Sequence, residues 1–133
     1  MYEGYLIKIG DYTVPLELLA PKSYKAIPNI QDLDPFRNAD GVLFRNALPH
    51  IPITMEFTTM ENLTDTEINS MLSEIKRNYT NEQERRAIVT CYVPEWGEYV
   101  TQDMYLSQPE ITIGEIDKGK IIFESIKLQW IGY

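Results

Sequence analysis

The stretch LTDTEINSMLSEIKRNY, residues 63–79, carries the clearest structural pattern in the sequence. Thr64 is followed three residues later by Glu67, which is the spacing of a capping box at a helix N-terminus. Acidic residues lie in the first turn and basic residues near the end, the order that the helix dipole favours. Apolar residues recur at helical spacing at Ile68, Met71, Leu72, Ile75 and Tyr79. The stretch therefore predicts one amphipathic helix over residues 65–79, with its apolar stripe docked on a sheet.

The sequence before this helix predicts two strand regions. Residues 53–60 alternate between apolar and polar side chains, which is typical of a half-buried strand. Residues 5–14 form two aromatic and β-branched runs around Gly10–Asp11, a pattern that predicts an opening hairpin. Pro15 lacks the N–H that a sheet ladder needs, so the second strand of this hairpin is expected at a sheet edge.

The sequence after the helix is rich in strand patterns. Strands are expected at residues 87–93, 98–106, 111–116 and 120–131. Lys118 and Gly119 are expected to turn the last pair into a hairpin. The final strand is expected to carry on one face Ile122, Ile126, Leu128 and Trp130. This order of elements predicts a mainly β fold, a β-sandwich or a strongly bent antiparallel sheet, with one flanking α-helix.

Residues 20–52 lack regular periodicity and contain five prolines. Within them, Asp40–Gly41 lies between two short runs that contain Phe36 and Phe44, a strong local signal for a hairpin. A hairpin that is connected to the domain by long polar segments has little core of its own. We therefore expect an extended arm or hairpin at about residues 28–49 that leans on the rest of the domain or on a neighbouring subunit.

Length and composition restrict the class of protein. The 133 residues suit one domain better than two, and 44% hydrophobic with 24% charged residues is typical of a globular chain. Apolar runs are at most three residues long, so we expect no membrane-spanning helix and no signal peptide. The net charge of −8 opposes binding to nucleic-acid phosphates and to anionic lipid.

The residues that usually carry catalysis are sparse. Cys91 is the single cysteine and lies among apolar neighbours, so it is expected to be a buried small hydrophobe. His50 lies in a proline-flanked loop and is expected to be structural or solvent-exposed. Residues 94–97 form a turn, so Glu95 and Glu98 do not mark a glycosidase-like site. We expect no enzyme activity, no catalytic residue and no cofactor.

One group of oxygen-bearing side chains is a candidate for binding calcium. It comprises Asp32, Asp34, Asn38 and Asp40, directly before Gly41. A twelve-residue calcium loop needs its glycine at the sixth position and a glutamate at the twelfth, and this spacing fails both requirements. Turn formation and surface ion pairing explain these residues better, so no metal is expected.

Three features of the chain resemble small tail proteins encoded in prophages of low-GC Gram-positive bacteria. They are the opening MYEGY at residues 1–5, the segment RNADGVLFR at residues 37–45, and the single helix before the C-terminal strands. The order of elements is also similar to the tail-tube fold and to the ring-forming domain of distal tail proteins. In those proteins a β-sandwich carries a flanking helix, and one long hairpin or loop contacts the adjacent subunit. The resemblance implies a single tail-tube-like domain over residues 1–133.

The resemblance also implies a function. The chain is expected to be a structural virion protein of a phage tail, forming a hexameric ring at the tail tip or baseplate that continues the tail tube. Its expected partners are itself and the tail-tube, tail-tip or hub proteins, with no specific nucleic-acid or membrane binding. DNA is expected to pass through a lumen whose carboxylates repel it. The expected location is the virion, after synthesis in the cytoplasm of the bacterial host.

The same resemblance implies that residues 28–49 make the main subunit contact, with Arg37 and Arg45 pairing with acidic residues of a neighbour. The expected interface residues are Arg37, Asn38, Asp40, Gly41, Phe44 and Arg45. In the simplest alternative, both arginines are only solvated charges on a hairpin. Two other functions stay open at this point: a completion protein at the head-to-tail joint, and a monomeric binding module that acts outside the virion.

Overall fold

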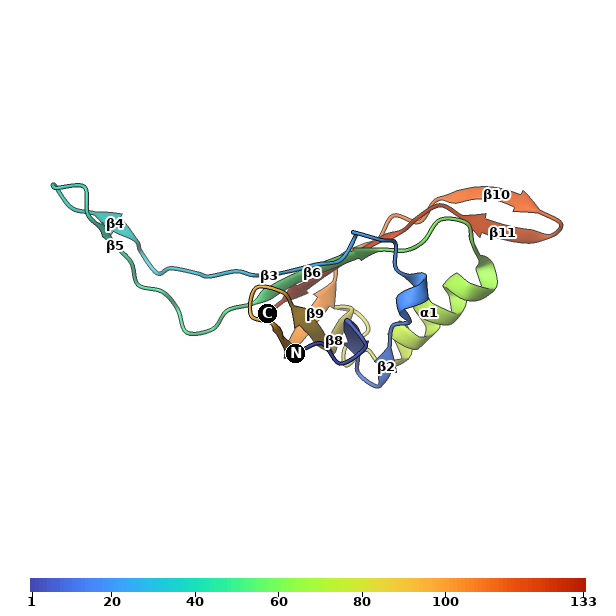
Figure 1. Cartoon of the computed structure of the whole chain (residues 1–133), viewed down its shortest axis with the longest axis horizontal. Helices are drawn as coiled ribbons and strands as arrows, with labels where there is room; N and C mark the ends of the chain where they lie inside the picture. Colours follow the sequence, from blue (N-terminus) through green and yellow to red (C-terminus); the bar gives the residue numbers. More distant parts are fainter.

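A seven-stranded antiparallel sheet forms the body of the molecule in the computed structural model, which describes residues 1–133 (Figure 1). Its strand order is β2-β1-β8-β9-β12-β6-β3. The strand bounds are β1 Ile7–Ile9, β2 Tyr12–Thr13, β3 Lys25–Pro28, β6 Ile53–Thr58, β8 Arg86–Val93, β9 Glu98–Leu106 and β12 Lys127–Gly132. The predicted opening hairpin is present as β1–β2, with Gly10 at a φ of +57° in its turn. Strand β2 lies at the sheet edge, as Pro15 predicted, and a short 3-10 helix, η1 (Leu16–Leu18), follows it.

One face of this sheet is buried and the other is open. The alternation predicted for β6 is confirmed, because Ile53, Met55 and Phe57 are buried and the residues between them are only half-buried. Helix α1 (Asp65–Arg77) contributes to the same core three buried side chains, Ile68, Met71 and Ile75. The mainly β fold with one flanking helix is confirmed.

The ends of α1 follow from side-chain hydrogen bonds. The predicted capping box is present, and the Thr64 backbone N–H donates to Glu67 Oε1 at 3.5 Å. The helix ends two residues earlier than predicted because Asn78 caps it. Asn78 Nδ2 donates to the Glu74 carbonyl at 2.8 Å, and Asn78 Oδ1 accepts the Asp11 N–H at 3.1 Å. The helix end is thereby fixed to the opening hairpin.

The sheet is strongly bent, which decides between the two predicted architectures. Strand β3 is at one edge and β8 is near the other, yet the two lie in contact. The Tyr24 hydroxyl, just before β3, donates to the carbonyl of Tyr92 in β8 at 2.5 Å. Folding the sheet over in this way encloses a single apolar core.

The prediction of one strand over residues 120–131 is wrong. The chain breaks at residues 124–126 into β11 (Lys120–Phe123) and β12. Thr59, fully buried, holds the chain at the break: its N–H donates to the Ile126 carbonyl at 2.8 Å and its hydroxyl accepts the Ile126 N–H at 2.9 Å. Ile122 therefore does not share a sheet face with Leu128 and Trp130, which stay in the main sheet.

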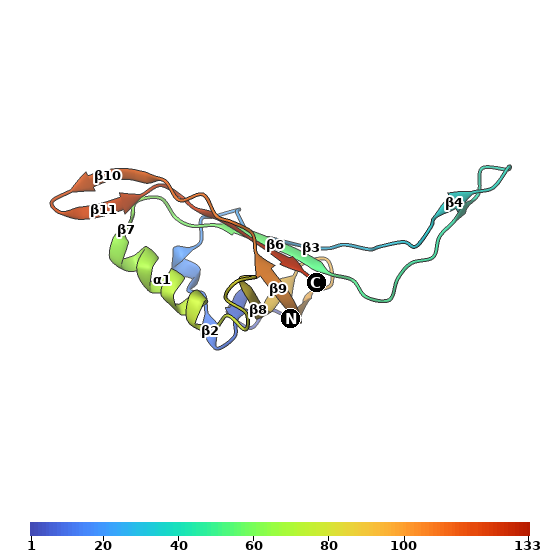
Figure 2. The same cartoon turned by 180° about the vertical axis from the view of Figure 1, so that it is seen from behind.

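Two hairpins project from opposite ends of the body (Figures 1 and 2). At one end, β10 (Ile113–Asp117) and β11 form a three-stranded sheet with the short β7 (Leu63–Thr64), in the order β10-β11-β7. At the other end, β4 (Phe36–Arg37) and β5 (Leu43–Phe44) form the tip of a long excursion. We call residues 29–50 the arm, and residues 113–123 the β10–β11 hairpin.

Candidate subunit interface

The arm has no core of its own. None of its side chains is buried, and only Asp32 is partly covered. Large apolar side chains are nevertheless frequent in it, and all are exposed: Ile30, Leu33, Phe36, Val42, Leu43, Phe44 and Leu48. A soluble monomer rarely exposes so many apolar groups on one segment without a partner. The arm is therefore the first candidate for an interaction surface.

The tip of the arm is built around an aromatic pair. Phe36 and Phe44 lie opposite each other in β4 and β5, with ring centroids 5.2 Å apart in a stacked arrangement. Their side chains remain 60% and 48% exposed. Each ring covers the other on one face only, so a large apolar area is left for another molecule to cover.

The turn at the tip is held by its own polar side chains. Asn38 Oδ1 accepts the backbone N–H groups of Asp40 and Val42, both at 3.0 Å. Gly41 has a φ of +81°, a conformation that favours glycine. Arg37 Nη1 donates to the Gly41 carbonyl at 2.9 Å. Asn38, Asp40 and Gly41 thus shape the turn and present the aromatic pair beside it.

The two arginines of the arm, for which the sequence analysis gave the same role, have different partners in the structure. Arg45 pairs within the arm, because its Nε and Nη2 lie 3.2 Å from the carboxylate of Asp32. This ion pair joins the two limbs of the arm beside the bridge between Asp32 and Ala47. Arg37 has no carboxylate partner in the molecule. Of these two arginines, only Arg37 has no ion pair within the molecule.

The base of the arm is fixed to the sheet by a side chain that the sequence analysis did not single out. Gln102 in β9 accepts the Ile53 N–H at 3.0 Å and donates to the Ile51 carbonyl at 2.8 Å. Gly132 allows this approach, since a Cβ there would lie 2.8 Å from Gln102 Oε1. One sequence signal could have indicated this role: Gln102 is a polar residue two positions before the apolar Met104, which is buried, so it faces the same side of β9. On the other limb, Asn29 Nδ2 donates to Thr54 Oγ1 at 2.7 Å.

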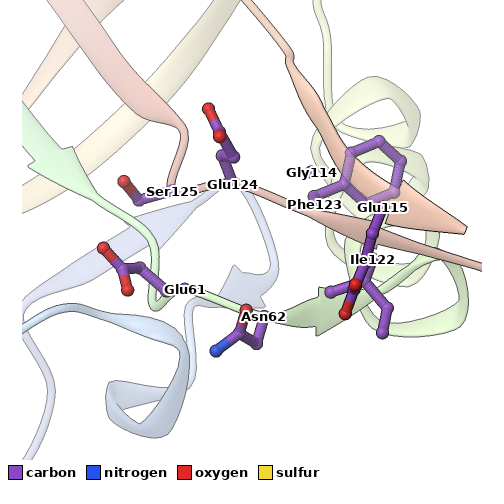
Figure 3. A pocket seen from close by; sticks show the side chains of 8 residues that line it. All are labelled: Glu61, Asn62, Gly114, Glu115, Ile122, Phe123, Glu124 and Ser125. Carbon is purple, nitrogen blue, oxygen red and sulfur yellow. The ribbon is translucent and has the colours of Figure 1, made fainter. Parts of the chain in front are cut away.

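A second surface lies at the other end of the molecule, beside the β10–β11 hairpin. A hollow of about 450 Å³ lies there (Figure 3), formed by the residues just before β7, strands β10 and β11 and the break after β11. Its lining residues are Glu61, Asn62, Gly114, Glu115, Ile122, Phe123, Glu124 and Ser125. Strand β10 forms the outer edge of its sheet, and all five of its residues are exposed. Sequence patterns predicted the strands but not this hollow, which also needs Glu61 and Asn62 from before the helix.

The open face of the seven-stranded sheet is mixed in charge. Its charged side chains are Lys8, Lys25, Glu56, Arg86, Asp103 and Lys127. Glu56 lies between two lysines, 3.6 Å from Lys25 Nζ and 3.2 Å from Lys127 Nζ. Four cations and two carboxylates share this face, so the negative charge of the chain is carried elsewhere.

The shifted pKa values lie on the body, away from both hairpins. The hydrogen bond from Arg86, 2.9 Å away, holds the pKa of Asp103 below its usual range. Burial raises the pKa of the Cys91 thiol to about 12, so this cysteine is the inert core residue that the sequence predicted. His50 is exposed, as predicted, and contacts the Tyr133 carbonyl. No group of three or more His, Cys, Asp or Glu side chains is placed to hold a metal ion, and no helix has the length and hydropathy of a membrane span.

Comparison with known proteins finds one family model and two solved structures that match this chain. A family model described as "Family of unknown function (DUF6711)" matches residues 1–133. The chain belongs to the DUF6711 family. No curated protein matches the sequence.

Two solved structures share the fold across the whole chain. One is a chain from the tail of an empty gene transfer agent particle with C6 symmetry, with a TM-score of 0.52 and 13% identity. The other is a chain from the virion of a native gene transfer agent particle, with a TM-score of 0.54 and 12% identity. Each comparison covers 100% of this chain and 95% of the other. This DUF6711 chain therefore has the fold of a chain found in such a tail.

Proposed function

We propose that this DUF6711 chain is a structural protein of a phage-like tail, and that it forms a hexameric ring at the tail tip or baseplate that continues the tail tube. In this proposal the protein is made in the cytoplasm of a Gram-positive host and ends in the virion. Its partners are further copies of itself and the tube, tip or hub proteins. It has no enzymatic role.

The observation that carries the proposal is the similarity in fold, over the full length, to a chain in a tail with C6 symmetry. The comparison covers all of this chain, the arm included, and nearly all of the other chain. A hexameric ring follows if this chain shares the symmetry of that particle, because a heterologous contact closes when its rotation divides a full turn.

The state of the arm supports the arm as the main subunit contact. Its apolar side chains are exposed, and its base is fixed by Gln102 and Asn29, so the segment is held away from the body. We propose that the contact includes the residues named from the sequence, with different roles. Phe44 supplies apolar area and Arg37 supplies charge, while Asn38, Asp40 and Gly41 shape the tip and Arg45 stiffens the arm through Asp32.

DNA passes through the lumen of the ring in this proposal. A lumen that carries carboxylates repels DNA and lets it move without sticking. The open sheet face holds more cations than carboxylates, so an acidic lining has to come from another surface of the chain. Replacing the lumen carboxylates with lysine is expected to slow DNA ejection, and unchanged ejection would count against this part of the proposal.

Deletion of the arm tests the proposal directly. The Asn29 N–H donates to the Pro52 carbonyl at 2.9 Å, so a short Gly-Ser linker in place of residues 30–49 closes the gap without strain. The full chain is expected to associate with rising concentration in light scattering. The deletion variant is expected to stay monomeric with an unchanged circular dichroism spectrum. Rings formed by a folded deletion variant would refute the arm as the main contact.

Two further measurements separate the other functions. A full chain that stays monomeric at every concentration favours a binding module outside the virion. Labelled protein seen by electron microscopy at the head-to-tail joint, instead of the tail tip, favours a completion protein.

A further inference from the structure

We propose that the β10–β11 hairpin receives the tip of the arm from a second copy, so that copies join head to tail. This inference rests on the proposed function and names the partner of the arm. The two surfaces lie at opposite ends of the molecule (Figures 1 and 2), so a chain cannot make this contact with itself. Each limb of the arm has about eleven residues and spans up to about 35 Å when extended, so the tip reaches well beyond its own body.

The backbone of β10 offers an open edge. This strand pairs only with β11, so its outer N–H and C=O groups have no strand beside them. Such an edge is a ready site for the addition of an extended segment from another chain. The arm supplies extended segments whose backbone is paired only in part, at β4–β5 and near Asp32.

Apolar side chains on the two surfaces are exposed in the monomer. Ile113 and Ile116 of β10 are 52% and 71% exposed, although isoleucine is among the residues most often buried. On the arm, Phe36 and Phe44 present a stacked pair of comparable exposure beside Val42. Contact between the two surfaces removes both apolar areas from water at once.

The charges on the two surfaces are complementary. Three carboxylates line the hollow, Glu61, Glu115 and Glu124. None of them takes part in an ion pair of the molecule. Arg37, near the aromatic pair, is the arginine of the arm without a carboxylate partner. An arginine that enters the hollow of the next copy meets several carboxylates, which fixes the register of the contact.

The geometry of the contact has a consequence for assembly. One end of each copy binds the opposite end of another, so the contact is heterologous and each copy keeps one free arm and one free hairpin until the assembly closes. A symmetric contact between two arms would instead stop at a dimer. The two cases differ in which residues come close.

Cysteine cross-linking distinguishes these cases. Val42→Cys is placed at the arm tip and Ile116→Cys on β10, in separate copies of the full chain, both at exposed positions. The native Cys91 is buried and does not compete. A bismaleimide reagent is expected to join the two variants when they are mixed. Neither variant is expected to cross-link when it is present by itself. Cross-linking of Val42→Cys with itself would show an arm-to-arm contact and overturn the inference.

Charge exchange gives a second measurement. Arg37→Glu or Glu115→Lys alone is expected to weaken association about tenfold, and the Arg37→Glu chain mixed with the Glu115→Lys chain is expected to recover most of the loss. Glu95→Lys, an exposed carboxylate in the β8–β9 turn, is the matched control and is expected to leave association unchanged. If Glu95→Lys weakens association as much as Glu115→Lys, net charge explains the effect and the inference fails.

The outcome also separates this inference from the proposed function. If the full chain associates and the arm deletion abolishes association, but neither cross-link nor charge rescue occurs, the arm is the contact and β10–β11 is not its receptor. If the full chain never associates, the proposed function fails and the inference fails with it.

Discussion

The two hairpins at the ends of this molecule differ in the support that they receive from the body. The β10–β11 hairpin continues a sheet that includes β7, and Phe123 at its base packs against the hydrophobic core. The arm packs against no part of the core. It is held at its base and by contacts within itself, among them the β4–β5 pairing and the ion pair between Asp32 and Arg45. The comparison teaches that two hairpins with exposed apolar residues can differ in support: the β10–β11 hairpin is stabilised from below by its own domain, whereas the arm has no such support.

The largest expected effect compares the body with the arm through the same substitution. Phe57→Ala removes a fully buried ring from the core and is expected to lower the free energy of unfolding by about 3–5 kcal/mol. Phe36→Ala removes a ring that is 60% exposed on the arm and is expected to change it by less than about 0.5 kcal/mol. Urea denaturation of the monomer, at low concentration, measures both. A large loss for Phe36→Ala would mean that the arm is part of the folding unit.

The second prediction compares the two hairpins. Phe123→Ala is expected to cost about 1–2 kcal/mol, because this half-buried ring packs against the core. Phe44→Ala, at the tip of the arm, is expected to leave monomer stability nearly unchanged and to weaken association instead. The measurements are urea denaturation and light scattering on both variants. Equal stability losses would remove the distinction between the hairpins.

The third prediction concerns the junction between helix α1 and the β10–β11 hairpin. Thr64 belongs to β7 and also caps α1, so Thr64→Ala is expected to cost about 1 kcal/mol. Because β7 supports β11, amide exchange should rise at residues 121–123 in this variant and stay the same in the arm. Exchange that rises in both hairpins alike would contradict independent support.

The smallest expected effect is a dependence on pH that belongs to the body. Arg86 lowers the pKa of Asp103, so the folded state favours the ionised carboxylate. The contribution is fully present above the unfolded carboxyl pKa of about 3.9 and is lost as the pH falls through the lower folded value. Asp103→Asn should remove this acid-sensitive part, and its Tm difference from the native chain should shrink below about pH 4. A Tm difference that grows on acidification would mean that the ionised Asp103 carboxylate does not stabilise the folded state.

Much of the fold was predictable because local pattern and tertiary structure agree. The capping box at Thr64, the alternation of Ile53, Met55 and Phe57 and the burial of Cys91 were all predicted and are confirmed. The prediction of one long C-terminal strand was wrong because the sequence of residues 120–131 does not show that its two halves join different sheets. The break depends on hydrogen bonds from Thr59, more than sixty residues earlier in the chain.

The candidate interface was predictable in part. Prolines and the Asp40–Gly41 turn indicated an arm with little core, since these are local signals. The different roles of Arg37 and Arg45 were not predictable, because Asp32 reaches Arg45 only when the two limbs lie side by side. The hollow beside β10 was not predictable either, because it joins residues from before and after helix α1.

By itself, the sequence determined the elements: one capped helix, strands with a two-residue period and a proline-rich segment without a core, because these follow from contacts within a few residues. The tertiary structure alone decided the bend of the sheet, the break at residues 124–126 and the placement of the two hairpins at opposite ends. These depend on hydrogen bonds and packing between residues that are distant in sequence, such as Tyr24 with Tyr92 and Thr59 with Ile126.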